Sequence, residues 1–182
     1  ITDPVVAFEL PNGSQTQPVG QLQFNNVIFG YGDNAPIIDD FNLSIAPGSA
    51  VALVGATGSG KSTIVRLLTR FHDVQRGSIK IDGVDIRSLS LNDLRTAVGI
   101  VFEETFLFHD SVFDNIAFAQ PDASLQVVER AAKLAGAHDF ILELPHGYAT
   151  ILGERGYSLS GGQRQRIAIA RAIVSDPRIL VL

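Results

Sequence analysis

A glycine-rich run in the first half of the chain has the residue types and the spacing of a phosphate-binding loop. It satisfies G-x-x-x-x-G-K-[ST] and contains Gly55, Ala56, Thr57, Gly58, Ser59, Gly60, Lys61, Ser62 and Thr63. Glycines let several backbone N–H groups turn toward one anion, and a following helix adds its N-terminal N–H groups and its dipole. Lys61 is suited to the outer phosphates, and the Ser62 hydroxyl to Mg²⁺. We therefore expect a nucleoside triphosphate site rather than a glycine-rich turn with a chance Lys-Ser pair.

The segment LSGGQ at residues 159–163 is a second candidate for phosphate chemistry. Ser160 and Gln163 fit the S-x-x-Q capping box of a helix that starts here. Capping does not account for Gly161 and Gly162, because a first helical turn disfavours glycine. Glycines at a helix start do allow a phosphate to come close to backbone N–H groups. The segment therefore predicts a second phosphate contact.

Together and in this order, the two motifs resemble the ATP-binding cassette (ABC) family, and the resemblance covers residues 21–182. It implies that ATP and Mg²⁺ are the cofactors and that two such domains pair head to tail, as a homodimer or a heterodimer. Each ATP would lie between the phosphate loop of one domain and the LSGGQ segment of the other. The four residues of that segment, Ser160, Gly161, Gly162 and Gln163, would thus contact the partner's ATP, and Lys61 would act in hydrolysis.

Two further segments match the family's nucleotide site. Tyr31 in FGYG resembles the aromatic residue that stacks on adenine, although from the residues alone it could equally be a core residue at a strand end.

Glu103 in VFEETFLF stands where the family usually has glutamine. Glutamate keeps an oxygen for Mg²⁺, but it adds a charge and loses an amide donor. The resemblance implies that Glu103 binds Mg²⁺, takes part in catalysis and lies near a transmembrane domain.

Other features resemble exporters in particular. The stretch GERG, between Gly153 and Gly156, resembles the segment by which exporters contact their transmembrane domain; a solvated charged loop is the alternative. Residues 1–20 contain prolines, glycines and clustered polar residues, and are predicted to be a linker from a membrane domain. The resemblance places the protein at the cytoplasmic face of the cell membrane.

The final run RILVL resembles a strand that the family follows with an Asp-Glu pair, and this pair is not in the sequence. Because the family's catalytic base is that glutamate, residues 1–182 alone are expected to bind ATP without hydrolysing it. The leading hypothesis is an ATP-hydrolysing domain that powers an exporter. The alternative left open is the degenerate, non-hydrolysing half of a heterodimeric transporter.

The elements expected to position these residues are both strands and helices. Strands are expected at residues 21–31, 37–45, 49–54, 78–81, 84–86, 98–102 and 179–182. Helices are expected at 61–70, at 91–97, over most of 111–144 and at 161–175. The predicted fold is α/β: a P-loop NTPase core of the ABC ATPase type in residues 21–182, with an antiparallel β-lobe and a helical subdomain at about 109–158.

Composition argues against several other classes. The 182 residues contain no cysteine, so a disulfide framework and a thiolate metal site are impossible. The net charge of −5 disfavours binding to nucleic acid. Together with the exporter-like features, this charge makes a soluble ABC protein acting on DNA or ribosomes the weaker alternative. No apolar run reaches the ~18 residues that a transmembrane helix needs.

Overall fold

The structure, a computed structural model, describes residues 20–32, 35–102, 105–153, 156 and 158–182. The chain forms two compact units, one up to Val98 with Val181, the other from Gly99 to Leu180 with Leu182. The strands are β1 (Leu22–Phe29), β2 (Ile38–Ile45), β3 (Arg76–Ile81), β4 (Val84–Asp85), β5 (Val98–Ile100) and β6 (Ile179–Val181). The α-helices are α1 (Lys61–Leu68), α2 (Leu91–Ala97), α3 (Val112–Ala117), α4 (Leu125–Leu134), α5 (His138–Leu142) and α6 (Gly161–Ile173). Two 3₁₀ helices are η1 (Ile86–Ser88) and η2 (Gly147–Ala149).

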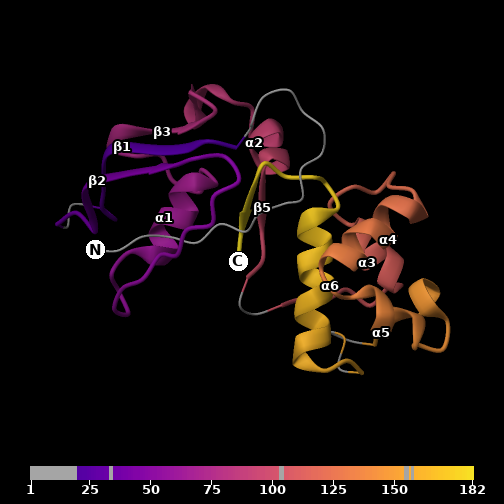
Figure 1. The fold of residues 1–182 in the computed structure, drawn as a ribbon. Coiled ribbons are helices and arrows are strands. Elements are labelled where there is room, and N and C mark those ends of the chain that lie inside the picture. The colour runs from indigo at the N-terminus through magenta and orange to yellow at the C-terminus, as the bar shows by residue number, and fades with distance from the viewer. Residues whose placement is uncertain (1–19, 33–34, 103–104, 154–155, 157) are drawn as a thin grey trace. The chain divides into compact units, whose positions relative to one another are not determined.

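The first unit contains an antiparallel sheet in the order β2-β1-β3-β4. β1 pairs on both sides: its first residue, Leu22, lies opposite Ile45 of β2 and Ile81 of β3. Buried apolar residues recur along β1 and β3 because alternate side chains point to the same face. Figure 1 shows α1 beside this sheet, and its buried residues are Thr63, Ile64, Leu67 and Leu68. The predicted antiparallel β-lobe is therefore present.

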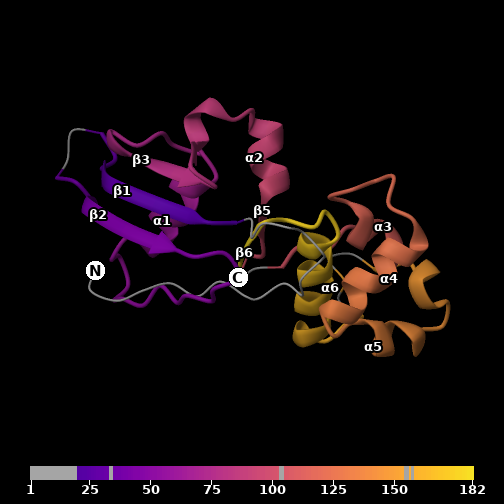
Figure 2. The same ribbon diagram turned by 45° about the horizontal axis from the view of Figure 1, so that its top comes forward.

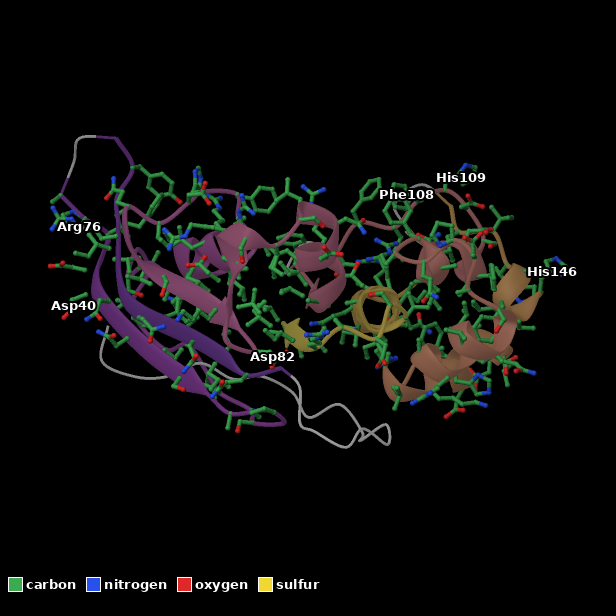
Figure 3. All side chains as sticks on the ribbon, turned by 90° about the horizontal axis from the view of Figure 1, so that it is seen from above. Asp40, Arg76, Asp82, Phe108, His109 and His146 are labelled. Carbon is green, nitrogen blue, oxygen red and sulfur yellow. The ribbon has the colours of Figure 1, made fainter. Side chains whose placement is uncertain are left out.

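Asp82 and Gly83 form the tight turn of a hairpin between β3 and β4, as their sequence predicted. Both residues have positive φ angles, 50° and 79°, as a two-residue turn of type I′ requires. One carboxylate oxygen of Asp82 accepts hydrogen bonds from the backbone N–H groups of Gly20 and Gln21, at 2.7 and 2.9 Å. Figure 3 labels Asp82 at this turn, with Asp40 and Arg76 toward the opposite end of the sheet. The turn thus fixes where the chain enters β1.

The second unit is mainly helical, and α6 contacts both α3 and α4 (Figure 2). Its core includes Leu107, Val112, Ile116, Val128, Ala132, Ile141, Leu152 and Ile167. The mainly helical region predicted over 111–144 is present and is divided into three helices, α3, α4 and α5. The breaks have local causes: Pro121 lies between α3 and α4, Ser124 caps α4, and Gly136 follows α4 with a φ of 64°.

A two-stranded sheet joins β5 to β6. Gly99 in β5 is required by a close approach: a Cβ atom there would lie 2.8 Å from the carbonyl oxygen of Ala172 and 2.9 Å from Cγ of Pro177. The last turn of α6 and the chain that follows it therefore pack directly on the backbone of β5. This strand ends at Ile100, two residues before the predicted end.

The strand predicted at 49–54 is not observed. Residues 49–53 are irregular, and only Val54 forms an isolated bridge, with 60% of its surface exposed. The apolar run satisfies the sequence pattern of a buried parallel strand, but the hydrogen bonds of such a strand must come from segments distant in sequence. The pattern is local and those bonds are not, which is why the prediction was wrong.

Candidate nucleotide-binding site

The loop before α1 has a backbone that only glycine adopts easily. Gly58 and Gly60 have φ angles of 84° and 93°, in the left-handed region. Gly55 is restricted in another way, because a Cβ atom there would lie 2.5 Å from Oγ of Ser59. A turn closed by the Ser59 N–H and the Ala56 carbonyl, at 3.1 Å, completes the loop. The predicted glycines therefore have structural reasons for their positions.

The N-terminus of α1 differs from that of most other helices in the described residues. Serine side chains cap α2, α3, α4 and α6, namely Ser90, Ser111, Ser124 and Ser160. The N-cap of α1 is Gly60, and no side chain caps this helix. Its first-turn N–H groups are thus not occupied by a capping side chain, and the helix dipole adds partial positive charge there. This arrangement is chemically suited to bind phosphate oxygens.

Lys61, the first residue of α1, turns back over the loop. Its Nζ donates to the carbonyl oxygens of Gly55 and Ala56 at 2.7 and 2.9 Å, and to Oγ of Ser59 at 3.4 Å. The ammonium group therefore already lies at the loop, where it can exchange carbonyl oxygens for phosphate oxygens. The next residue, Ser62, is exposed, whereas the Thr63 side chain is buried.

Tyr31 follows β1 and is half-buried beside α1. Its ring centroid lies 5.0 Å from that of Phe29 and 5.2 Å from that of His72, both in edge-to-face geometry. Nη1 of Arg66 donates to the Tyr31 hydroxyl at 3.5 Å. Hydrogen bonds with Thr63, and secondarily with Arg66, lower the pKa of Tyr31 because they stabilise the phenolate. Arg66 and His72 were not predicted to contact Tyr31, because no motif in the sequence marks either residue.

The LSGGQ segment forms the capping box expected from its sequence. Oγ of Ser160 accepts from the Gln163 N–H at 3.2 Å, and Oε1 of Gln163 accepts from the Ser160 N–H at 2.8 Å. Gly161 and Gly162 are exposed at the start of α6. Because Ser160 accepts through its oxygen, its hydroxyl proton remains able to donate. The contact of this segment with a partner's nucleotide stays a prediction.

Glu103 lies outside the described residues, but the segment after it is held by α6. Arg171 of α6 donates to the Phe106 carbonyl at 2.9 Å, the Asn115 carbonyl at 2.7 Å and Oδ1 of Asn115 at 2.8 Å. Its guanidinium also lies 5.3 Å from the ring centroid of Phe108, which Figure 3 labels. Burial lowers the pKa of Arg171. This network was not predicted from the sequence; it connects the segment after Glu103 to the helix that begins in LSGGQ.

The remaining predicted features are only partly described. Glu154 and Arg155, and the predicted linker up to residue 19, lie outside the described residues. Next to them, Gly153 is exposed, and Gly156 is buried with a φ of 66°. Within the described ranges, no group of three or more acidic, histidine or cysteine residues could hold a metal ion. Of the helices that the structure describes, none has the length and the hydrophobicity to cross a membrane.

Known proteins are similar to this chain over nearly its whole length. A Staphylococcus aureus protein provisionally named as a multidrug export ATP-binding/permease protein is 47% identical over 180 residues, which are 96% of this chain and 31% of that protein. The ATP-dependent lipid A-core flippase of Saccharophagus degradans is 49% identical over 175 residues, covering 94% of this chain and 30% of the flippase. The chain thus spans about 31% of the length of such relatives.

A solved structure and a family model agree with these relatives. The structure of a bacterial Atm1-family ABC exporter with ATP bound matches with a TM-score of 0.78 and 43% identity, covering 94% of this chain and 30% of that one. The family model described as ABC transporter matches residues 38–182. Taken with the α/β fold, the glycine loop and the capped LSGGQ helix, this shows that the chain belongs to the ABC transporter family, as an exporter-type ATP-binding domain.

Proposed function

We propose that this chain binds ATP with Mg²⁺ and belongs to a protein in which ATP hydrolysis powers an exporter. The observation that carries the proposal is the loop at Gly58 and Gly60, which leads into the uncapped N-terminus of α1 beside the Lys61 ammonium group. Backbone N–H groups, a helix dipole and a mobile cation converge there on one place. The relatives support the same reading, because one is named an ATP-dependent flippase and a similar solved structure has ATP bound.

The residues of the loop have separate roles in this proposal. The N–H groups of residues 55–63 bind and orient the phosphates, and Lys61 balances their charge. The Ser62 hydroxyl is exposed on the first turn of α1, which suits a magnesium ion held mainly by phosphate and water oxygens. Glu103 is proposed as a second oxygen ligand and a contributor to catalysis. When bound, Mg²⁺ supplies positive charge that offsets the charge of the phosphates. Tyr31 is proposed to stack on the adenine.

The proposal includes two protein partners. A second ABC domain would face this one head to tail. The Ser160 hydroxyl and the N–H groups of Gly161 and Gly162 would then donate hydrogen bonds to the ATP bound by the partner domain, and Gln163 would maintain the capping box. A transmembrane domain would contact the chain near Glu103 and between Gly153 and Gly156. Relatives named as ATP-binding/permease proteins support this second partner, and with it a position at the cytoplasmic face of the membrane.

Titration calorimetry with ATP in the presence of Mg²⁺ tests the proposal. Lys61→Ala should weaken ATP binding by at least about 1.5–3 kcal/mol, the usual worth of a charge-assisted hydrogen bond. Lys133→Ala, which removes an exposed charge on α4, is the matched control and should leave the affinity unchanged. Unaltered ATP affinity in Lys61→Ala would refute the phosphate loop, and so would absence of ATP binding in the unmodified protein.

A further inference from the structure

Two of the side chains that contact Tyr31, Arg66 at its hydroxyl and His72 at its ring, belong to no sequence motif. We propose that Arg66 and His72 are positioning residues that orient the Tyr31 ring for adenine, so that α1 sets the base contact as well as the phosphate contacts. This inference rests on the proposed ATP-binding function, and it adds the residues that determine how the base is recognised.

Aromatic contacts fix the plane of the Tyr31 ring. That plane is 85° from the Phe29 ring and 83° from the His72 ring, whereas Phe29 and His72 are only 36° apart. Tyr31 therefore stands nearly perpendicular to both neighbours, in the edge-to-face geometry that aromatic pairs favour. Neither of them stacks in parallel on Tyr31. The edge-to-face contacts with Phe29 and His72 thus orient the ring, and they differ from the parallel stacking by which an adenine base would bind it.

Contacts at the hydroxyl fix the other end of the side chain. The Arg66 guanidinium donates to it at 3.5 Å, and Thr63 also forms a hydrogen bond with it. Thr63 and Arg66 are three residues apart on α1 and so lie on the same face of the helix. With its plane and its hydroxyl both held, the ring has little freedom left to lose when a ligand binds. Such preorganisation raises affinity because the cost of ordering is already met.

The same helix carries the phosphate contacts. α1 begins at Lys61, directly after the loop, and its buried face of Ile64, Leu67 and Leu68 fixes its position in the first unit. A helix of this kind holds Thr63 and Arg66 at a constant distance from its own N-terminus. The spacing between phosphate and adenine contacts is therefore set within one rigid element. Arg66 acts through Tyr31 in this account, and not directly on the nucleotide.

Calorimetry with two ligands separates these roles. Tripolyphosphate carries the three phosphates of ATP without the base, so it reports on the loop alone. Arg66→Gln should raise the dissociation constant for ATP about three- to tenfold, and that for tripolyphosphate less than about twofold, because only the base contact depends on Tyr31. Arg95→Gln is the matched control, since Arg95 is also exposed in the last turn of a helix, and it should change neither constant.

A double-mutant cycle tests whether Arg66 works through the hydroxyl of Tyr31. Tyr31→Phe should weaken ATP binding at least as much as Arg66→Gln, because it also removes the hydrogen bond with Thr63. The double variant should bind ATP no more weakly than Tyr31→Phe alone, because Arg66 then has no hydroxyl to contact. For His72, the Phe variant should retain ATP affinity and the Ala variant should lose about threefold, since a ring is what Tyr31 contacts. His72 is exposed, so neither variant should affect folding.

Several results would overturn the inference. Equal losses of ATP and tripolyphosphate affinity in Arg66→Gln would show that Arg66 acts as a general charge near the phosphates. Additive losses in the cycle would show that it acts independently of Tyr31. If the unmodified protein bound tripolyphosphate as tightly as ATP, the result would support the phosphate loop but would refute the adenine contact and, with it, this inference. If it bound neither ligand, the proposed function would fail, and the inference with it.

Discussion

Gly58 determines the shape of the phosphate loop through its backbone alone. Its φ is 84°, and a Cβ atom added there would meet nothing within 4 Å. An L-residue in this left-handed region costs roughly 1–2 kcal/mol. Gly58→Ala should therefore weaken tripolyphosphate binding by a factor of about 5–30, measured by calorimetry.

Gly153→Ala is the control for this backbone effect. Gly153 also has open space around a Cβ atom but has no positive φ. It should leave the affinity for tripolyphosphate unchanged. If Gly58→Ala binds tripolyphosphate as well as Gly153→Ala does, the loop reaches its binding conformation without a left-handed residue at position 58.

Single residues could be predicted where a short motif contains the whole geometry. The roles proposed for Lys61 and Ser62 rest on neighbours within one loop, and both residues lie at the start of α1, as predicted. The contacts of Tyr31 and Arg171 could not be predicted in this way. Arg66 is 35 residues from Tyr31, and the Phe106 carbonyl is 65 residues from Arg171. Only the fold brings such pairs together.

The starts of two helices could be predicted from their local caps. The predicted starts of α2 and α6 are the observed ones, because Ser90 and Ser160 bond to N–H groups three residues ahead. Helix periodicity alone missed the breaks at Pro121 and Gly136. Strands were harder where their partners are distant, so the run at 49–54 was predicted wrongly although its composition fits a buried strand.

The cap of α6 offers a test that separates stability from function. Ser160→Ala should lower the free energy of unfolding by about 1 kcal/mol, as loss of an N-cap usually does. Ser90→Ala should cost a similar amount, because Ser90 is also exposed and accepts from the Asp93 N–H at 3.1 Å. Only Ser160→Ala should also weaken ATP-dependent self-association, measured by sedimentation velocity. If Ser160→Ala and Ser90→Ala showed the same ATP-dependent self-association, Ser160 would have no role beyond capping α6.

Alkaline pH should destabilise the helical unit through Tyr148. Burial, and secondarily the charge of Glu129, raises the pKa of Tyr148 to about 12 from 10.0, and its hydroxyl lies 2.9 Å from Nδ1 of His138. The folded state therefore favours the protonated phenol. This contribution to stability is fully present below the unfolded pKa of 10.0 and is lost as the pH rises through about 12.

Denaturant unfolding of the protein and of Tyr148→Phe between pH 8 and pH 12 measures this effect. The free energy of unfolding should fall more steeply above about pH 10 in the unmodified protein than in the variant, which has no phenol at this position. Other groups titrate in both proteins, so the difference between the two curves isolates Tyr148. Parallel curves would show that the Tyr148 phenol ionises as easily in the folded state as in the unfolded one.

At the scale of the whole molecule, the phosphate loop and the LSGGQ helix belong to different compact units. The fold class and the antiparallel lobe could be predicted because hydrophobic periodicity and turn residues carry them locally. Neither hydrophobic periodicity nor turn residues indicate how two copies of the chain assemble. The head-to-tail pairing therefore remains a proposal, and it requires a test in which one copy supplies the loop and another supplies the LSGGQ segment.

Two variants, each defective in one half of the shared site, provide this test. Lys61→Ala removes the cation of the loop. Gly162→Asp places a carboxylate where the partner's phosphate should lie. This aspartate should leave the fold intact, because a Cβ atom at Gly162 meets only the Arg166 guanidinium, at 3.9 Å, and an acidic residue favours a helix N-terminus. Neither variant alone should form an ATP-dependent dimer.

Mixing the two variants should restore dimers. In a head-to-tail pair, the loop of Gly162→Asp and the LSGGQ segment of Lys61→Ala are both intact and form one complete site, while the other site carries both defects. Light scattering with ATP and Mg²⁺ should therefore detect dimers in the mixture that neither variant forms alone. If each domain instead used its own loop and its own LSGGQ segment, every site in the mixture would carry one defect. The mixture would then stay monomeric, because no combination of the two chains would contain an intact site.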